Sequence, residues 1–205
     1  MARRSLLLAS LIALPLAASA ASASFNSGDE GWTTPVGGTQ TWMPTGGNGG
    51  GWVQVEDTDG NTDIHLTAPS AWLGDWSAYN GGTFSFDARN VNGLSTDWPG
   101  FGEVTISGTA GSVVLDIAAP GQPTADGLWH HYSVSLTSAA GWTGSAPLAS
   151  VLAHVTGLTI NGELHAGPGE IVGFDNIQVT AVPEPASAAL LLGGLVLLAG
   201  WRRKR

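Results

Sequence analysis

The amino-acid sequence predicts an antiparallel β-sandwich for the central part of the chain. Short runs of alternating apolar and polar residues recur there, helical periodicity is nearly absent, and 30 glycines and 11 prolines punctuate the 205 residues. Alternation is the pattern of a half-buried strand, and seven or more such runs separated by turns are typical of two packed sheets. The fold class we expect is therefore all-β.

The expected elements follow in chain order. Strands are predicted over residues 52–56, 83–89, 103–106, 113–117, 129–136, 157–161 and 174–179. One short helix is predicted between Pro147 and Val155, because apolar residues recur there at helical spacing and would cover an end of the sandwich. The residues expected to face inward are Phe84, Phe86, Val104, Ile106, Leu115, Ile117, Val134, Leu136, Leu158 and Ile160.

The N-terminus has the three parts of a secretory signal peptide, which we assign to residues 1–23. Arg3 and Arg4 form the positive region, and residues 6–18 form the apolar region. A small-residue cleavage site follows, either at residues 18–20 or at residues 21–23. The sandwich domain is accordingly expected to span residues 24–180.

The C-terminus, residues 181–205, reads as a trafficking tail. Pro183, Glu184 and Pro185 form an extended motif, residues 186–201 are apolar, and residues 202–205 are basic. As a helix the apolar segment would measure about 24 Å, less than the roughly 30 Å core of a bilayer, and the basic end should stay cytoplasmic. A permanent single-span anchor is the alternative to a signal that is processed.

This order of motif, short apolar helix and basic end resembles the PEP-CTERM sorting signal of Gram-negative bacteria. The resemblance implies that an exosortase recognises and processes the tail. The protein would then be exported through the inner membrane, held transiently in the membrane by its C-terminal helix, and finally reside at the cell surface or outside the cell.

The charge of the exported domain is strongly one-sided. Of seven Lys and Arg residues only Arg89 lies between the two ends, whereas fifteen of the sixteen acids lie between Asp29 and Asp175, which gives a net charge of about −14. Such a field repels phosphate backbones and anionic lipid, so nucleic acid is excluded as a partner. Clustered carboxylates would instead need an external counterion such as calcium.

Four segments resemble the laminin B (laminin IV type A) domain: residues 25–32, 68–87, 151–163 and 173–177. The resemblance implies a jelly-roll sandwich akin to carbohydrate-binding modules, with a structural Ca²⁺ between the first and last strands. It would place Asn26, Asp29 and Asp175 at that metal. Asn26 stands where an Asp often follows the opening Phe, which would lower the affinity. The alternative for Asp175 is a carboxylate that caps a turn or faces water.

A second acidic segment, residues 56–63, has the Asp-x-Asp-Gly pattern of a cation loop. It lacks the regular twelve-residue ligand spacing that ends in Glu. We therefore interpret it as an acidic hairpin turn in preference to a metal site.

Tryptophans supply the candidates for ligand binding. Trp42, Trp98 and Trp142 lie in Gly/Pro/Thr-rich segments and are expected to be exposed, whereas Trp32, Trp52, Trp72 and Trp129 are expected to be structural. An exposed indole can stack on the apolar face of a sugar while nearby polar groups bind its hydroxyls.

No sequence motif for a nucleophile, zinc or phosphate site is present, and neighbouring His130 and His131 should point to opposite faces of a strand. We expect a non-catalytic module that binds extracellular polysaccharide or matrix glycans. A structural envelope or matrix protein without a sugar site is the alternative.

Overall fold

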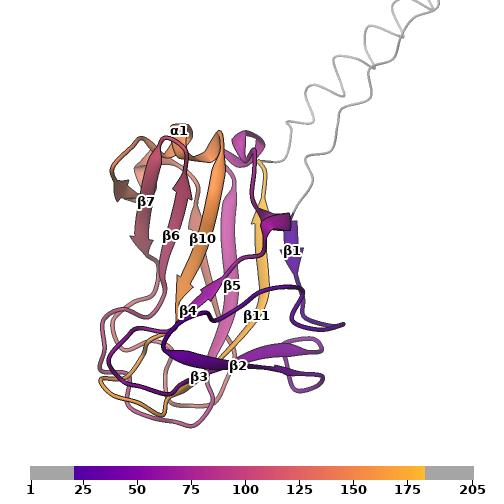
Figure 1. The fold of residues 1–205 in the computed structure, drawn as a ribbon, viewed down its shortest axis with the longest axis vertical. Helices are drawn as coiled ribbons and strands as arrows, with labels where there is room; N and C mark the ends of the chain where they lie inside the picture. Colours follow the sequence, from indigo (N-terminus) through magenta and orange to yellow (C-terminus); the bar gives the residue numbers. More distant parts are fainter. Residues whose placement is uncertain (1–20, 183–205) are drawn as a thin grey trace, which may run out of the picture.

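The computed structural model describes residues 21–182 as two packed antiparallel sheets (Figure 1). The first sheet has the order β2 (Gly38–Met43), β3 (Trp52–Asp57), β11 (Ile171–Thr180), β5 (Thr83–Asn90) and β8 (His130–Ser135), and β1 (Ala21–Ala23) also pairs with β11. The second has the order β4 (His65–Thr67), β10 (Val155–Asn161), β6 (Glu103–Gly108), β7 (Gly111–Asp116) and β9 (Thr143–Gly144). The predicted sandwich is confirmed.

Alternating residues of the two sheets meet in one apolar core. In β5 the side chains of Phe84, Phe86 and Ala88 are buried among those of β8 and β11, and Phe86 contacts the rings of Tyr132 and Phe174. Seven of the ten residues predicted to face inward are buried. Leu115, Ile117 and Val134 are half-buried instead, because they lie in or beside strands near the sheet edges.

Helices are short in the described residues and close one end of the sandwich. The predicted helix is present as α1 (Leu148–Leu152), which buries Leu148, Val151 and Leu152. Single 3-10 turns lie at Ser70–Trp72, Ser77–Tyr79 and Ser138–Ala140. Trp72 and Trp32 are buried against each other, as expected for structural tryptophans.

Strand β11 organises the first sheet. Its first half pairs with β3 and its second half with β1, while β5 runs along its other side. The register shifts between Asp175 and Gln178, and Asn176 adopts φ +49° in this bulge, a conformation that asparagine tolerates better than most residues.

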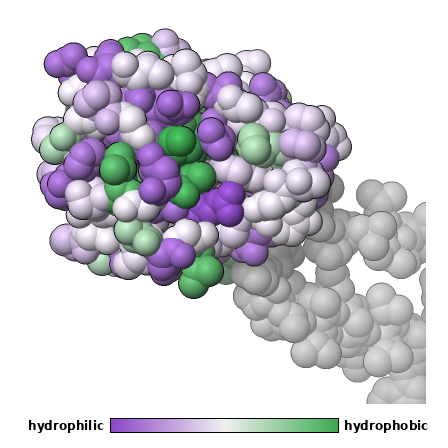
Figure 2. Space-filling model, turned by 90° about the horizontal axis from the view of Figure 1, so that it is seen from below, coloured by the Kyte–Doolittle hydropathy of each residue, from purple (hydrophilic) through white to green (hydrophobic). Residues whose placement is uncertain are grey.

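The two ends of the sandwich differ. One end carries α1 and the described chain ends, since Ala21 pairs with Val179. The opposite end, here called the loop end, carries segments 58–64, 91–102, 117–129 and 162–170. The ten residues of β11 separate the two ends by roughly 33 Å. Figure 2 views the loop end and shows apolar groups scattered among hydrophilic ones.

No helix within residues 21–182 is long and apolar enough to cross a membrane. The predicted apolar helix at 186–201 and the motif Pro183, Glu184 and Pro185 lie outside the described residues, as does most of the predicted signal peptide.

Candidate functional site

Trp98 is the centre of a polar cluster at the loop end. Its side chain is 42% exposed, and its Nε1 donates to Asp63 Oδ2 at 3.4 Å. The same oxygen accepts a hydrogen bond from Asn161 Nδ2 at 2.8 Å. An exposed indole therefore lies beside a half-buried carboxylate and a buried amide, the combination that suits a sugar ring and its hydroxyls.

The segment that carries Trp98 is held in place by its neighbours. The backbone amides of Asp97 and Trp98 both donate to Leu164 O. Asp97 Oδ1 accepts from the backbone of Ala166 at 2.9 Å and lies 3.0 Å from His165 Nδ1. Because these bonds join segment 91–102 to segment 162–170, the indole is positioned before any ligand arrives.

Gly100 makes the cluster possible. A Cβ at this position would lie 2.9 Å from Asn161 Nδ2, 3.0 Å from Asp63 Oδ2 and 3.1 Å from Trp98 Nε1. A Cβ would force at least one of these three side-chain groups to shift, so a glycine suits the cluster in its present geometry.

The other two tryptophan candidates lie in different surroundings. Trp42 is 38% exposed, but it lies in edge strand β2 rather than in a loop, and its Nε1 donates to Phe25 O at 2.7 Å. Trp142 was expected to be exposed; instead it is half-buried against the core and donates to Ser135 O at 3.0 Å. The structure therefore separates the three tryptophans and leaves Trp98 with polar side-chain partners.

The residues predicted to bind calcium meet only in part. Asn26 Oδ1 accepts from the backbone of Gly51 at 3.3 Å, and Asp175 Oδ2 accepts from that of Asn48 at 2.7 Å, so both contact segment 46–51. Asp29 is exposed and accepts from Gly31 in its own turn. Calcium at Asn26, Asp29 and Asp175 stays a prediction, and Asp175 lies within β11 rather than at its end.

Asp175 belongs to a buried polar network on the outer face of the first sheet. Asp87 Oδ2 accepts from the side-chain amides of Asn48 and Asn176, each at 2.8 Å, and Asp87 Oδ1 lies 2.7 Å from His131 Nδ1. Burial raises the pKa of Asp175 to about 6, against the lowering effect of its two backbone hydrogen bonds. These contacts attach segment 46–51 to the middle of the sheet.

The acidic segment 56–63 folds as a turn. Asp59 accepts hydrogen bonds from the backbones of Asn61 and Thr62, so the segment is a turn. The hairpin part of the interpretation is wrong, because β3 and β4 on either side of the turn belong to different sheets and do not pair with each other. Asp57 differs from its neighbours because it is buried and points into the sandwich. His130 and His131 pair with different acids, Asp126 and Asp87, from opposite faces of β8.

Two members of the Trp98 cluster, Asp63 and Asn161, were not anticipated. Asp63 was assigned to the acidic turn, and Asn161 to the end of a strand, so nothing in either segment alone indicated the contact. They are 98 positions apart in the sequence. Only the pairing of β4 with β10 brings them together.

The architecture is a β-sandwich whose fold is shared by solved structures of carbohydrate-binding modules. The fold is similar to the family 11 module of the cellulase Lic26A-Cel5E of Clostridium thermocellum, with a TM-score of 0.51, 16% identity and coverage of 83% of this chain and 99% of the module. It is also similar to the CBM22-1 xylan-binding domain of Paenibacillus barcinonensis Xyn10C, with a TM-score of 0.50, 16% identity and coverage of 80% and 95%.

Two further structures are similar. An exo-β-agarase has a TM-score of 0.54 and 14% identity, and the match covers 78% of this chain but 24% of the agarase. The L4b domain of human laminin α-2 has a TM-score of 0.48 and 12% identity, with coverage of 60% and 72%. No curated protein matches the chain by sequence. At these identities, the likenesses to the two carbohydrate-binding modules and to the agarase show the fold alone.

The sorting signal is a separate finding. Residues 181–205 match the PEP-CTERM protein-sorting motif, as the order of motif, apolar segment and basic end predicted. The chain is therefore an exported β-sandwich that carries a PEP-CTERM sorting signal.

Proposed function

We propose that the sandwich is a non-catalytic module that binds extracellular polysaccharide or matrix glycan at the loop end. Trp98 would stack on a sugar ring, and Asp63 would accept hydrogen bonds from its hydroxyls. The observation that carries this proposal is the exposed indole of Trp98 beside Asp63, whose two hydrogen bonds in the cluster both use Oδ2. The likeness to carbohydrate-binding modules agrees with it.

The position of the cluster suits display. The sorting motif begins at Ala181, at the end of the sandwich that carries the described chain ends, whereas Trp98 lies at the loop end. A module attached through its C-terminal end would therefore present the indole away from the attachment point. A domain charge of about −14 also favours neutral or cation-bridged glycans over anionic ones.

A binding experiment tests the sugar site. We expect the mature protein to bind a subset of a glycan array, and Trp98→Ala to weaken binding to those glycans about tenfold, the factor that corresponds to a contact worth about 1.4 kcal/mol. Titration calorimetry with the best glycan measures the change. Asp63→Asn should also weaken binding.

Trp42→Ala is the matched control, because Trp42 has nearly the same exposure and its Nε1 donates to a backbone carbonyl and not to a carboxylate. Its affinity should stay within about twofold of the wild type. Equal losses in both variants would contradict a site at Trp98. A protein that binds no glycan would favour the alternative, a structural envelope protein.

We further propose that an exosortase removes the tail and that signal peptidase cuts after Ala20. Cleavage there would keep β1, whose residue Ala23 is buried and pairs with Ile177, whereas cleavage after Ala23 would remove that strand. We expect the intact mass of the mature protein to correspond to a chain that begins at Ala21 and lacks the segment 186–205.

A full-length C-terminus on every mature molecule would show anchoring without processing. An N-terminus at Ser24 would show that β1 is dispensable.

A further inference from the structure

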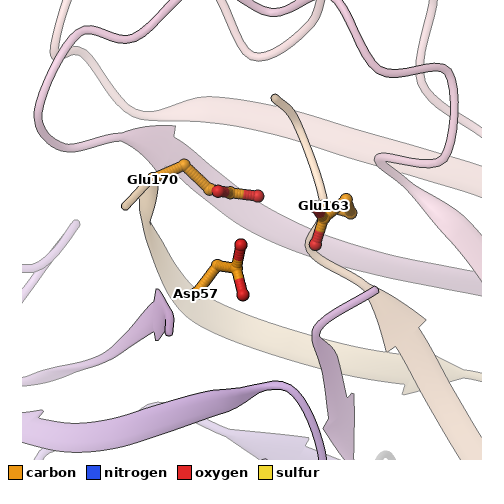
Figure 3. A group of neighbouring side chains, drawn as sticks. All are labelled: Asp57, Glu163 and Glu170. Carbon is orange, nitrogen blue, oxygen red and sulfur yellow. The ribbon is translucent and has the colours of Figure 1, made fainter. Parts of the chain in front are cut away.

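Three carboxylates converge inside the sandwich at the loop end (Figure 3). Asp57 is the last residue of β3, Glu170 directly precedes β11, and Glu163 follows β10 of the other sheet. Their exposed fractions are 1%, 0% and 4%, and one oxygen from each lies within 4.8 Å of the others. Acids from both sheets therefore share one buried space.

No positive side chain balances these acids in the part of the chain that the structure describes. Arg89, the only Lys or Arg between the two ends of the chain, has its guanidinium carbon over the rings of Trp52 and Trp129, at 4.3 and 4.8 Å from their centroids. The ion pairs among the described residues all join histidines to other aspartates. Burying several like charges without a counterion is costly.

Hydrogen bonds within the fold satisfy only two of the three groups. Glu163 Oε2 accepts from the backbone of Ile64 at 3.0 Å, and Asp57 accepts from the backbones of Asp59 and Gly60. Neither oxygen of Glu170 has a well-formed hydrogen bond within the described residues, although the side chain is fully buried and lies near the backbone of Leu164 and the carboxyl of Glu163. A buried, unpartnered carboxylate that points at two others indicates a missing ligand.

The donor set defines the class of that ligand. All three side chains offer oxygen, with no nitrogen or sulfur, which is the preference of a hard cation. Calcium takes six to eight oxygens and accepts bidentate carboxylates, so the two free oxygens of Glu170 suit it better than they suit magnesium, which usually retains several waters.

We propose that Asp57, Glu163 and Glu170 form an internal Ca²⁺ site that ties the ends of β3 and β11 to the segment after β10. This site is distinct from the one predicted around Asn26, Asp29 and Asp175. Glu170 alternates with the core residues Val172 and Phe174, so its side chain is on the core face of the strand. Asp175 is on the opposite face of β11, where it belongs to the network with Asp87. The bound ion would link the two sheets across the loop end.

In the metal-free protein, burial and the neighbouring acids raise the pKa of Glu163 to about 8, and burial also raises that of Glu170. Protons held by this group of carboxyls are therefore the arrangement that competes with a cation. Calcium has to displace those protons, so its binding should strengthen as the pH rises.

Thermal melts of the mature protein test the site. We expect millimolar calcium to raise the melting temperature by about 5 °C or more over chelator, and titration calorimetry of chelator-stripped protein to include a binding event that requires Glu170. Glu170→Gln and Glu163→Gln should each remove that event and most of the shift. In chelator, Glu170→Gln should melt at or above the wild type, because the neutral amide needs neither a proton nor a cation to be buried there.

Two control variants distinguish this site from other acids. Asp175→Asn tests the other predicted calcium position, and Asp59→Asn removes an exposed acid in the turn next to Asp57; both should keep the part of the calcium shift that Glu170→Gln removes. Coincident wild-type melts in calcium and chelator would overturn the proposal in favour of protonated carboxyls. The proposal would also be overturned if Asp175→Asn lost the calcium-dependent rise in melting temperature while Glu170→Gln kept it. A larger rise in melting temperature with magnesium than with calcium would overturn it as well.

Discussion

Replacing Phe86 by alanine should lower the free energy of unfolding by about 3–5 kcal/mol, the range for a large aromatic deleted from a core. Phe86 has no exposed surface, and its ring lies 5.2 Å from that of Tyr132, 6.0 Å from that of Phe174 and 6.2 Å from that of Phe84. The neighbours belong to strands on both sides of β5 and to β5 itself, so they can collapse into the cavity only partly. Equilibrium denaturation by urea measures the loss.

Ser85→Ala is the matched control for Phe86→Ala. Ser85 is the preceding residue of β5, points to the opposite face, and is half-buried. Its replacement should change the free energy of unfolding by less than about 0.5 kcal/mol. A loss below about 1 kcal/mol for Phe86→Ala would show that the faces of β5 are assigned the wrong way round.

The second large effect is expected at Asp87. Its carboxylate is the shared acceptor for Asn48, Asn176 and His131, so Asp87→Ala removes three hydrogen bonds to a buried, charged group. We expect a loss of about 2–3 kcal/mol in the free energy of unfolding. One hydrogen bond to a charged group contributes about 1.5–3 kcal/mol, and the total stays below the sum of three such bonds because the exposed Asn48 forms hydrogen bonds with water once it is released. Urea denaturation with the same protocol measures it.

His131→Ala separates the contributions within the network. The side chain of His131 is 63% exposed, so its removal leaves Asp87 with both amide donors and should cost less than about 1 kcal/mol. Equal losses for Asp87→Ala and His131→Ala would mean that the His131 contact, and not the two asparagines, accounts for the stabilisation.

The strands that the sequence predicted are those with one buried face. β5, β6 and β10 alternate between apolar and polar residues, and each begins within two residues of the expected position. β2 was missed because an edge strand of Gly, Thr and Gln with little burial has no alternating pattern. β1 was missed because its residues were assigned to the signal peptide, and β4 and β9 contain only three and two residues.

Site residues were predictable only where a single segment held the signal. Trp98 was identified from its surroundings in the sequence, whereas its partners Asp63 and Asn161 depend on the pairing of β4 with β10. For the three buried carboxylates a local signal did exist: Asp57 is in phase with Val53 and Val55 of β3. The alternation of β3 therefore indicates that Asp57 faces inward, but it does not indicate which other acids lie next to it.

By itself, the sequence determined the sorting signal, the one-sided charge and the all-β class, because each depends on composition or on short periodic runs. The tertiary structure decided which of fifteen acids lie together. Carboxylates attract a cation or raise one another's pKa only within a few ångströms, and that proximity is set by strand register between distant segments. Asp57, Glu163 and Glu170 meet because β3, β10 and β11 all have an end at the loop end of the sandwich, whereas Asp29 remains in its own turn.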